Sequence, residues 1–179
     1  MIITISGLSG SGKSTITKLL SKKLGFKYFD AGKAQRELAS EKGLSLLELN
    51  KLEEKDESFD NLIDNKILEQ ARKNKNIILE GRISGWTLHL NDIKAFKIWI
   101  ACPLDIRIER IASREQKNIE TTRKETLFRE KSEDIRYKKH YDIDRNDLSI
   151  YDLVVDSDKH LPNAIVGIIL NKLKEEKWT

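Results

Sequence analysis

A glycine-rich segment near the start of the chain contains the residues whose chemistry is easiest to recognise. The pattern G-x-x-x-x-G-K-[ST] occurs in the run Gly7-Leu8-Ser9-Gly10-Ser11-Gly12-Lys13-Ser14-Thr15. Glycines let backbone N–H groups converge on phosphate oxygens, and the N-terminus of a following helix adds a positive dipole. Lys13 supplies a positive charge for the β- and γ-phosphates, and the Ser14 hydroxyl can bind Mg²⁺. All nine residues are therefore candidate ligands of a nucleoside triphosphate, with Lys13 as a catalytic residue and Ser14 as the metal ligand.

Two further arginines follow the ends of expected strands, where an open parallel sheet binds its ligands. Planar guanidinium groups suit the bidentate binding of a phosphate, and glycines at positions 81 and 85 allow a second anion to approach closely. The candidate acceptor-binding residues are Asp30, Gly32, Arg36, Gly81 and Arg82. Two alternatives stay open, because Arg36 can be an ordinary surface residue and Arg82 can simply pair with a carboxylate.

A third basic set lies further along the chain. Arg107, Arg110 and Arg114 are spaced to share one helix face, and Arg129 and Arg136 lie seven residues apart. Transfer of a phosphoryl group brings several negative charges together, so positioned cations and the exclusion of water do most of the work. We therefore expect a lid whose candidate catalytic residues are Arg110, Arg114, Arg129 and Arg136. Acidic residues are also frequent there, so a salt-bridged, exposed helix is the alternative.

The hydrophobic pattern indicates which elements position these residues. Short β-branched runs alternate with amphipathic segments, which predicts an α/β fold: a parallel sheet with helices on both faces. The expected strands cover residues 1–5, 26–29, 76–80, 95–101 and 151–156. No Pro- or Gly-rich linker divides the chain, so we expect one domain. Its parts are a core of residues 1–30, 76–112 and 141–179, a helical acceptor-binding insertion of about 31–75, and a helical lid of about 113–140.

The composition limits the class of protein. A chain of 179 residues with 39% hydrophobic and 35% charged residues can form one sizeable core. Its net charge of +4 is too small to indicate nucleic-acid binding. No apolar run is long enough to span a bilayer, and no secretory signal is recognisable. A single cysteine, Cys102, excludes an intramolecular disulfide. We expect a cytoplasmic protein that binds neither nucleic acid nor membrane.

The phosphate loop alone does not specify a reaction. A GTPase would need an Asn-Lys-x-Asp motif after a late strand. The nearest match, Asn65-Lys66-Ile67-Leu68, lacks the aspartate and lies within an expected helix. Large ATP-driven motors have longer chains and an acidic pair at the end of a strand. A small phosphotransferase is therefore the leading hypothesis.

Four segments together resemble archaeal-type cytidylate kinases, over nearly the whole chain. They are the phosphate loop, Asp30-Ala31-Gly32 with Arg36, the run Leu79-Glu80-Gly81-Arg82-Ile83-Ser84-Gly85-Trp86, and Tyr141-Asp142-Ile143-Asp144 leading into Asn146-Asp147-Leu148-Ser149-Ile150-Tyr151-Asp152-Leu153. The Gly-Arg…Gly-Trp and Asn-Asp-Leu-Ser-Ile-Tyr-Asp-Leu stretches are the most specific. The chain departs from many archaeal members at Gly12-Lys13-Ser14-Thr15, where they carry Gly-Thr-Thr-Thr.

The resemblance implies a five-stranded P-loop core with strand order 2-3-1-4-5. It also implies that ATP phosphorylates CMP or dCMP, that Arg36 and Arg82 hold the monophosphate, and that the lid arginines bridge the reacting phosphates. We expect Mg²⁺ as the cofactor and a monomer. A carboxylate should accept from the exocyclic amine of cytosine, but several carboxylates qualify. Two alternatives stay open: a related kinase for AMP, UMP or a small hydroxy acid, and a non-catalytic protein that uses ATP as a switch.

Overall fold

The computed structural model describes residues 1–54, 56 and 58–178. Five strands among these residues form one parallel sheet. The strands are β1 (Ile2–Ser6), β2 (Lys27–Asp30), β3 (Ile77–Glu80), β4 (Phe96–Ala101) and β5 (Leu153–Asp156). Their order, β2-β3-β1-β4-β5, confirms the prediction. The central strands β1 and β3 are almost wholly buried, which agrees with the predominance of isoleucine and leucine in their sequences. Positions 55 and 57 of the predicted acceptor-binding insertion, and position 179, lie outside the described residues.

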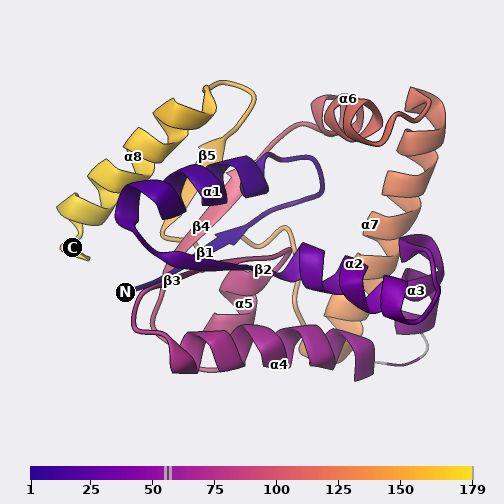
Figure 1. Ribbon diagram of the computed structural model, residues 1–179, viewed down its shortest axis with the longest axis horizontal. Helices are drawn as coiled ribbons and strands as arrows, with labels where there is room; N and C mark the ends of the chain where they lie inside the picture. The colour runs from indigo at the N-terminus through magenta and orange to yellow at the C-terminus, as the bar shows by residue number, and fades with distance from the viewer. Residues whose placement is uncertain (55, 57, 179) are drawn as a thin grey trace.

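Helices cover both faces of the sheet (Figure 1). One face carries α1 (Lys13–Leu24) and α8 (Pro162–Glu175), and the other carries α4 (Ser58–Lys73) and α5 (Ser84–His89). The core on the first face contains Ile5, Ile16, Leu20, Ile98, Ile165 and Ile169. The core on the second face contains Ile67, Ala71, Leu79 and Leu88. Two apolar cores thus fix the sheet whose carboxyl end carries the predicted ligand-binding loops.

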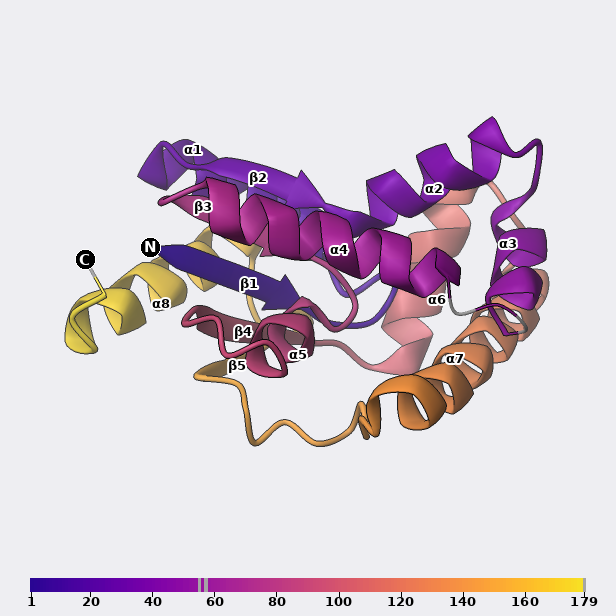
Figure 2. The same cartoon turned by 90° about the horizontal axis from the view of Figure 1, so that it is seen from below.

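The segments outside the core are helical, as predicted. The predicted acceptor-binding insertion contains α2 (Ala31–Glu41), α3 (Leu46–Glu53) and α4, and the predicted lid contains most of α7 (Ile119–Tyr141). Helix α6 (Leu104–Glu115) runs from the predicted core into the start of the lid. Ser45 and Glu48 form a capping box that begins α3. The long helix α7 lies beyond the carboxyl end of the sheet and packs against α3 and α6 (Figure 2). Two segments distant in sequence, α3 and α7, therefore meet beyond the carboxyl end of the sheet, where the sequence predicts the ligand-binding site.

One helix was not expected from the sequence. Ser84 and Gly85, interpreted as a turn open to an anion, instead form the first turn of α5. Gly85 is buried, and a Cβ atom there would lie 2.6 Å from Cε1 of Tyr151. The glycine therefore serves close packing against an aromatic ring, whereas Gly81 does line the ligand-binding region. In the part of the chain that the structure describes, no helix combines the length and apolar character needed to cross a membrane.

Candidate active site

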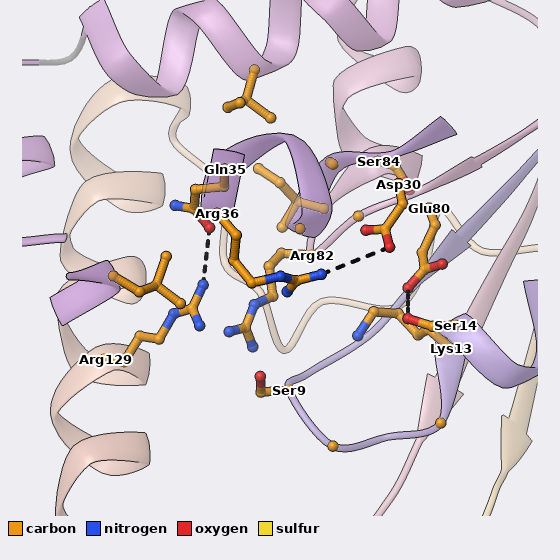
Figure 3. A pocket seen from close by; sticks show the side chains of 18 of the residues that line it. Ser9, Lys13, Ser14, Asp30, Gln35, Arg36, Glu80, Arg82, Ser84 and Arg129 are labelled. Atoms are coloured by element: carbon orange, nitrogen blue, oxygen red, sulfur yellow. Dashed lines mark hydrogen bonds and ion pairs between the residues drawn. The ribbon is translucent and has the colours of Figure 1, made fainter. Parts of the chain in front are cut away.

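A cleft of about 980 Å³ lies at the carboxyl end of the sheet (Figure 3). Most of the residues predicted for the site line it: Ser9, Gly10, Gly12, Lys13, Ser14, Thr15, Asp30, Gly32, Arg36, Gly81, Arg82, Arg110, Arg114 and Arg129. Four predicted residues are not part of the lining: Gly7, Leu8, Ser11 and Arg136. The predicted triphosphate site and the predicted acceptor site therefore belong to one cavity.

The glycines of the phosphate loop adopt backbone conformations that other residues rarely take. The angle φ is +145° at Gly7, +78° at Gly10 and +89° at Gly12. A Cβ atom at Gly7 would lie 2.6 Å from the backbone oxygen of Ile100, and one at Gly10 would lie 2.6 Å from that of Arg107. Gly12 is the N-cap of α1, whose first N–H groups have no partner within the helix. The loop can therefore offer main-chain donors to an anion.

Lys13 places its ammonium group inside the loop. The side chain is half-buried, and its Nζ donates to the backbone oxygen of Leu8 at 2.7 Å. Burial and the positive charge of Arg82 lower the pKa of Lys13 to about 7, although nearby carboxylates oppose this effect. A phosphate beside Nζ would stabilise the charged form. Binding of an anion here is thus coupled to protonation of Lys13.

Ser14 and Glu80 supply oxygen atoms beside the phosphate loop. Ser14 Oγ donates to Glu80 Oε1 at 2.6 Å, while the buried Oε2 accepts no hydrogen bond from the residues that the structure describes. Burial and the neighbouring Asp30 carboxylate raise the pKa of Glu80. A hydroxyl and a carboxylate are ligands that suit Mg²⁺, which commonly binds through one or two protein groups and substrate phosphates. The chemistry of this pair therefore fits a divalent cation.

The start of α2 forms the acceptor side of the cleft. Asp30 caps the helix by accepting from the backbone N–H of Lys33 at 2.9 Å, and its Oδ2 lies 3.9 Å from Arg36 Nη2. Figure 3 shows Arg36 extending from α2 with its guanidinium group towards Asp30. The Arg36 side chain is 57% exposed, so this ion pair is weak. A Cβ atom at Gly32 would lie 3.3 Å from Asp30 Oδ1, which is a tight contact, so the glycine leaves room for the carboxylate that caps the helix.

A buried carboxylate of α7 holds two other arginines of the cleft. The Glu133 side chain is 1% exposed, and its Oε1 lies 3.1 Å from Arg82 Nη2 and accepts from Arg129 Nε at 2.9 Å. Arg145 Nη1 lies 3.8 Å from the other oxygen. Burial alone would raise the pKa of the Glu133 carboxyl, but the guanidinium groups of Arg82 and Arg129 hold it below its usual range. We refer to Glu133, Arg82, Arg129 and Arg145 as the Glu133 hub.

The hub leaves donors for a ligand. Arg82 Nη1 is buried and has no hydrogen-bond partner among residues 1–54, 56 and 58–178. Arg129 Nη2 donates to Gln35 Oε1 at 2.9 Å, which links α7 to α2 across the cleft (Figure 3). Both arginines line the cleft while one carboxylate fixes their orientation. The open alternative that Arg82 pairs with a carboxylate is thus correct for one edge of its guanidinium group, and the group still faces the cavity.

The remaining basic residues of the predicted lid separate into two groups. Arg110 and Arg114 line the cleft, and Arg110 also donates to the hydroxyl and backbone oxygens of Ser157, both at 2.9 Å. Arg136 instead is buried and forms an ion pair with Glu53 of α3. The seven-residue spacing from Arg129 predicts that Arg136 faces the cleft, but the structure places it against α3, which covers that part of α7.

Several residues that line the cleft were not predicted: Lys18, Gln35, Leu46, Ile63, Asp64, Ile67, Glu80, Ile83, Glu115 and Tyr137. Most come from helices, and three of them (Ile63, Asp64 and Ile67) come from α4, where they are scattered among other polar or apolar residues. Only Glu80 carried a recognisable signal, because it directly precedes Gly81-Arg82 at the end of a strand. The position of the others depends on how the helices pack.

Comparisons with known proteins agree with this architecture. Residues 2–159 match the cytidylate kinase-like family. The chain belongs to this family. A cytidylate kinase of Methanocella arvoryzae is 43% identical over 177 residues, which cover 99% of each chain. A cytidylate kinase of Sulfurisphaera tokodaii is 44% identical over 169 residues, covering 94% of this chain and 93% of that one.

Solved structures show the same fold at lower identity. An uncharacterised protein from Eubacterium ventriosum has a TM-score of 0.71 and 18% identity, covering 97% of this chain and 98% of its own. Shikimate kinase from Aquifex aeolicus has a TM-score of 0.60 and 22% identity, covering 99% of both chains. These structures confirm the P-loop kinase fold of this family member.

Proposed function

We propose that this chain is an ATP-dependent nucleoside monophosphate kinase that transfers the γ-phosphoryl group of ATP to CMP or dCMP. The products are ADP and CDP or dCDP. The observation that carries the proposal is one cleft containing a triphosphate-binding loop and a second set of anion-binding groups, Arg36 and Arg82. Relatives named cytidylate kinase, at 40–44% identity over at least 94% of this chain, support the choice of acceptor.

The roles of the residues follow from their positions. The main-chain N–H groups of the phosphate loop and Lys13 bind the ATP phosphates. Arg36 and Arg82 bind the phosphate of the monophosphate, whose oxygen is already ionised at neutral pH and needs no strong base. Arg110, Arg114 and Arg129 neutralise the charge that accumulates during transfer. Arg136 was predicted for the same work, but from its pairing with Glu53 we propose that it holds α7 on α3.

We propose Mg²⁺ as the divalent cation, bound with ATP at Ser14 and Glu80. When bound, it would neutralise charge on the β- and γ-phosphates. The Ser14 hydroxyl can turn from Glu80 towards the cation, and the unpartnered Oε2 of Glu80 can accept a hydrogen bond from a water molecule. These two groups come from the first turn of α1 and the end of β3, both of which are fixed by the cores of the sheet.

The two insertions have separate parts in this proposal. Residues of about 31–75 bind the acceptor, and residues of about 113–140 close over the reacting phosphates. The Arg129–Gln35 hydrogen bond joins these two segments and supports a closed arrangement. We further propose that the enzyme works as a monomer in the cytoplasm, where ATP and CMP occur together.

A coupled assay of ADP release tests the function. The panel contains CMP, dCMP, UMP, AMP and a small hydroxy acid such as shikimate, each with ATP and Mg²⁺. We expect kcat/KM for CMP or dCMP to exceed that for the other acceptors at least tenfold. A preference for AMP, UMP or the hydroxy acid would contradict the cytidylate assignment. Absence of stimulation by every acceptor would instead favour the non-catalytic ATP-binding alternative.

A further inference from the structure

Reading cytosine requires a group that recognises its polar edge. Cytosine presents an amino donor at N4, and uracil presents the O4 acceptor in the same place. A carboxylate in the acceptor part of the cleft would accept from the amine and repel the uracil oxygen. Among the residues that the structure describes, four carboxylate residues line the cleft: Asp30, Asp64, Glu80 and Glu115.

Three of these carboxylates already interact with the phosphate loop, with the start of α2 or with lid residues. Asp30 caps α2 and faces Arg36, and Glu80 accepts from Ser14 beside the phosphate loop. Glu115 forms ion pairs with Arg114 and Lys117 at the end of α6. All three therefore lie beside residues proposed to bind phosphates or beside residues of the lid. Asp64 is the carboxylate that remains within the described lining.

Asp64 lies in the less polar part of the cleft. It belongs to α4, whose neighbouring residues Ile63 and Ile67 line the same cavity together with Ile83 and Tyr137. Apolar and aromatic side chains suit the faces of a planar base, while a few placed polar groups fix its orientation. Burial raises the pKa of Asp64, as expected for a carboxylate in such surroundings.

Two hydroxyl groups fix the orientation of the Asp64 carboxylate. Thr87 of α5 donates to Oδ1 at 3.1 Å, and Tyr141 of α7 donates to Oδ2 at 2.7 Å. Each carboxylate oxygen can accept a second hydrogen bond. The group is therefore held in place by two other helices and still has acceptor capacity for a ligand.

We propose that Asp64 reads the cytosine edge of the acceptor by accepting a hydrogen bond from its N4 amino group. The inference rests on the proposed function, because it presupposes that the acceptor is a pyrimidine monophosphate. It adds a specificity-determining residue that the sequence motifs do not contain. The discrimination between CMP and UMP then depends on the charge and acceptor character of one side chain on α4.

The test compares the ratio of kcat/KM for CMP to kcat/KM for UMP in wild type and Asp64→Asn. The amide can donate to uracil O4, so we expect the ratio to fall by roughly 10- to 100-fold. Glu69→Gln, an exposed carboxylate of the same helix paired with Lys73, is the matched control and should leave the ratio unchanged. KM for ATP should stay within about twofold in both variants. A folded Asp64→Asn enzyme whose ratio is unchanged would overturn the proposal, as would an equal loss for both substrates.

A second measurement needs no variant and covers the case in which Asp64→Asn does not fold. The wild-type enzyme is assayed with the monophosphate of a 2-pyrimidinone riboside, which lacks the N4 amino group. We expect kcat/KM at least about tenfold below that for CMP. Equal use of the two would overturn the inference while leaving the kinase function intact. If the wild type phosphorylates neither CMP nor dCMP, the proposed function itself fails.

Discussion

Removal of the central charge of the Glu133 hub gives a quantitative test of how the cleft is held together. In Glu133→Gln, a neutral amide faces Arg82, Arg129 and Arg145 in a region where the wild-type carboxylate is 1% exposed. Breaking a buried ion pair by removing one partner typically costs about 3–5 kcal/mol, because the other charge stays buried. We therefore expect the free energy of unfolding to fall by about 3 kcal/mol or more, out of a total of roughly 5–15 kcal/mol.

Urea unfolding followed by tryptophan fluorescence measures this change. Glu120→Gln is the matched control, because Glu120 lies on the same helix and pairs with Lys124 while both side chains are 77% exposed. Such an exposed pair contributes about 0.3–0.5 kcal/mol. A loss in Glu133→Gln no larger than in Glu120→Gln would refute the electrostatic account of the hub.

The pH dependence of stability gives an independent check on the same carboxylate. Although burial alone would raise it, the pKa of Glu133 in the folded protein lies below the usual 4.5 because of the surrounding arginines. A lowered pKa means that the unfolded chain binds the proton more tightly. The stabilisation is therefore present above about pH 4.5 and is lost as the pH falls through the folded-state pKa. Glu133→Gln should lack this part of the acid dependence.

Three further predictions concern the ligands. Lys13→Ala should lower kcat about 100-fold or more without unfolding the protein. Because phosphates should raise the pKa of Lys13 from about 7, we also expect calorimetry at pH 8 to show proton uptake when ATP binds to the wild type, and the variant should lack it. Unchanged uptake would contradict the coupling. Arg36→Ala should raise KM for CMP roughly tenfold or more and KM for ATP less than about twofold, as initial rates can show. Glu80→Gln should raise the Mg²⁺ concentration for half-maximal activity roughly tenfold; an unchanged titration would exclude Glu80 from the cation site.

Short sequence patterns were enough to predict the phosphate loop and the strands, because each of these features is formed by residues close together in the chain. The phosphate loop follows from glycine spacing, and the five strands follow from short apolar runs between turn residues. The strand boundaries shifted only slightly, since β2 begins at Lys27 and β5 at Leu153. Each of these features is determined by residues within one or two turns of chain. The strand order, in contrast, came from the family resemblance.

The network behind the cleft could not be predicted, because its helix gives no amphipathic signal. Charged residues occur all round α7, so the sequence does not indicate which of them are buried. Glu133 and Arg136 are buried because they lie on the parts of α7 that face α3 and the arginines of the cleft, whereas Glu120 is exposed. Asp64 is likewise one of many polar residues on α4. The identity of a buried charge on such helices depends on contacts with segments far away in the sequence.

The two most specific segments of the family resemblance have a structural reason to occur together. Gly85 belongs to the Gly-Arg…Gly-Trp stretch, and Tyr151 belongs to the Asn-Asp-Leu-Ser-Ile-Tyr-Asp-Leu stretch. The Tyr151 ring occupies the space that a Cβ atom at Gly85 would need, and it also packs on Trp99 of β4 with ring centroids 5.3 Å apart. The contact joins the start of α5 to the segment before β5.

The arginines of the cleft differ in how firmly neighbouring side chains orient them. This difference suggests the order in which they contact an acceptor phosphate. Arg82 and Arg129 are oriented by the buried Glu133, so their arrangement exists before any ligand arrives. The side chains of Arg36 and Arg114 are instead 57% and 60% exposed, and their ion pairs with Asp30 and Glu115 lie at the surface of the cleft. Asp134 also pairs with Arg145, so the two arginines of the hub that line the cleft, Arg82 and Arg129, share the single carboxylate of Glu133 and leave positive charge facing the cavity. An acceptor phosphate would therefore meet a preformed site first, and the exposed side chains of Arg36 and Arg114 would then close around it at the cost of their own conformational entropy.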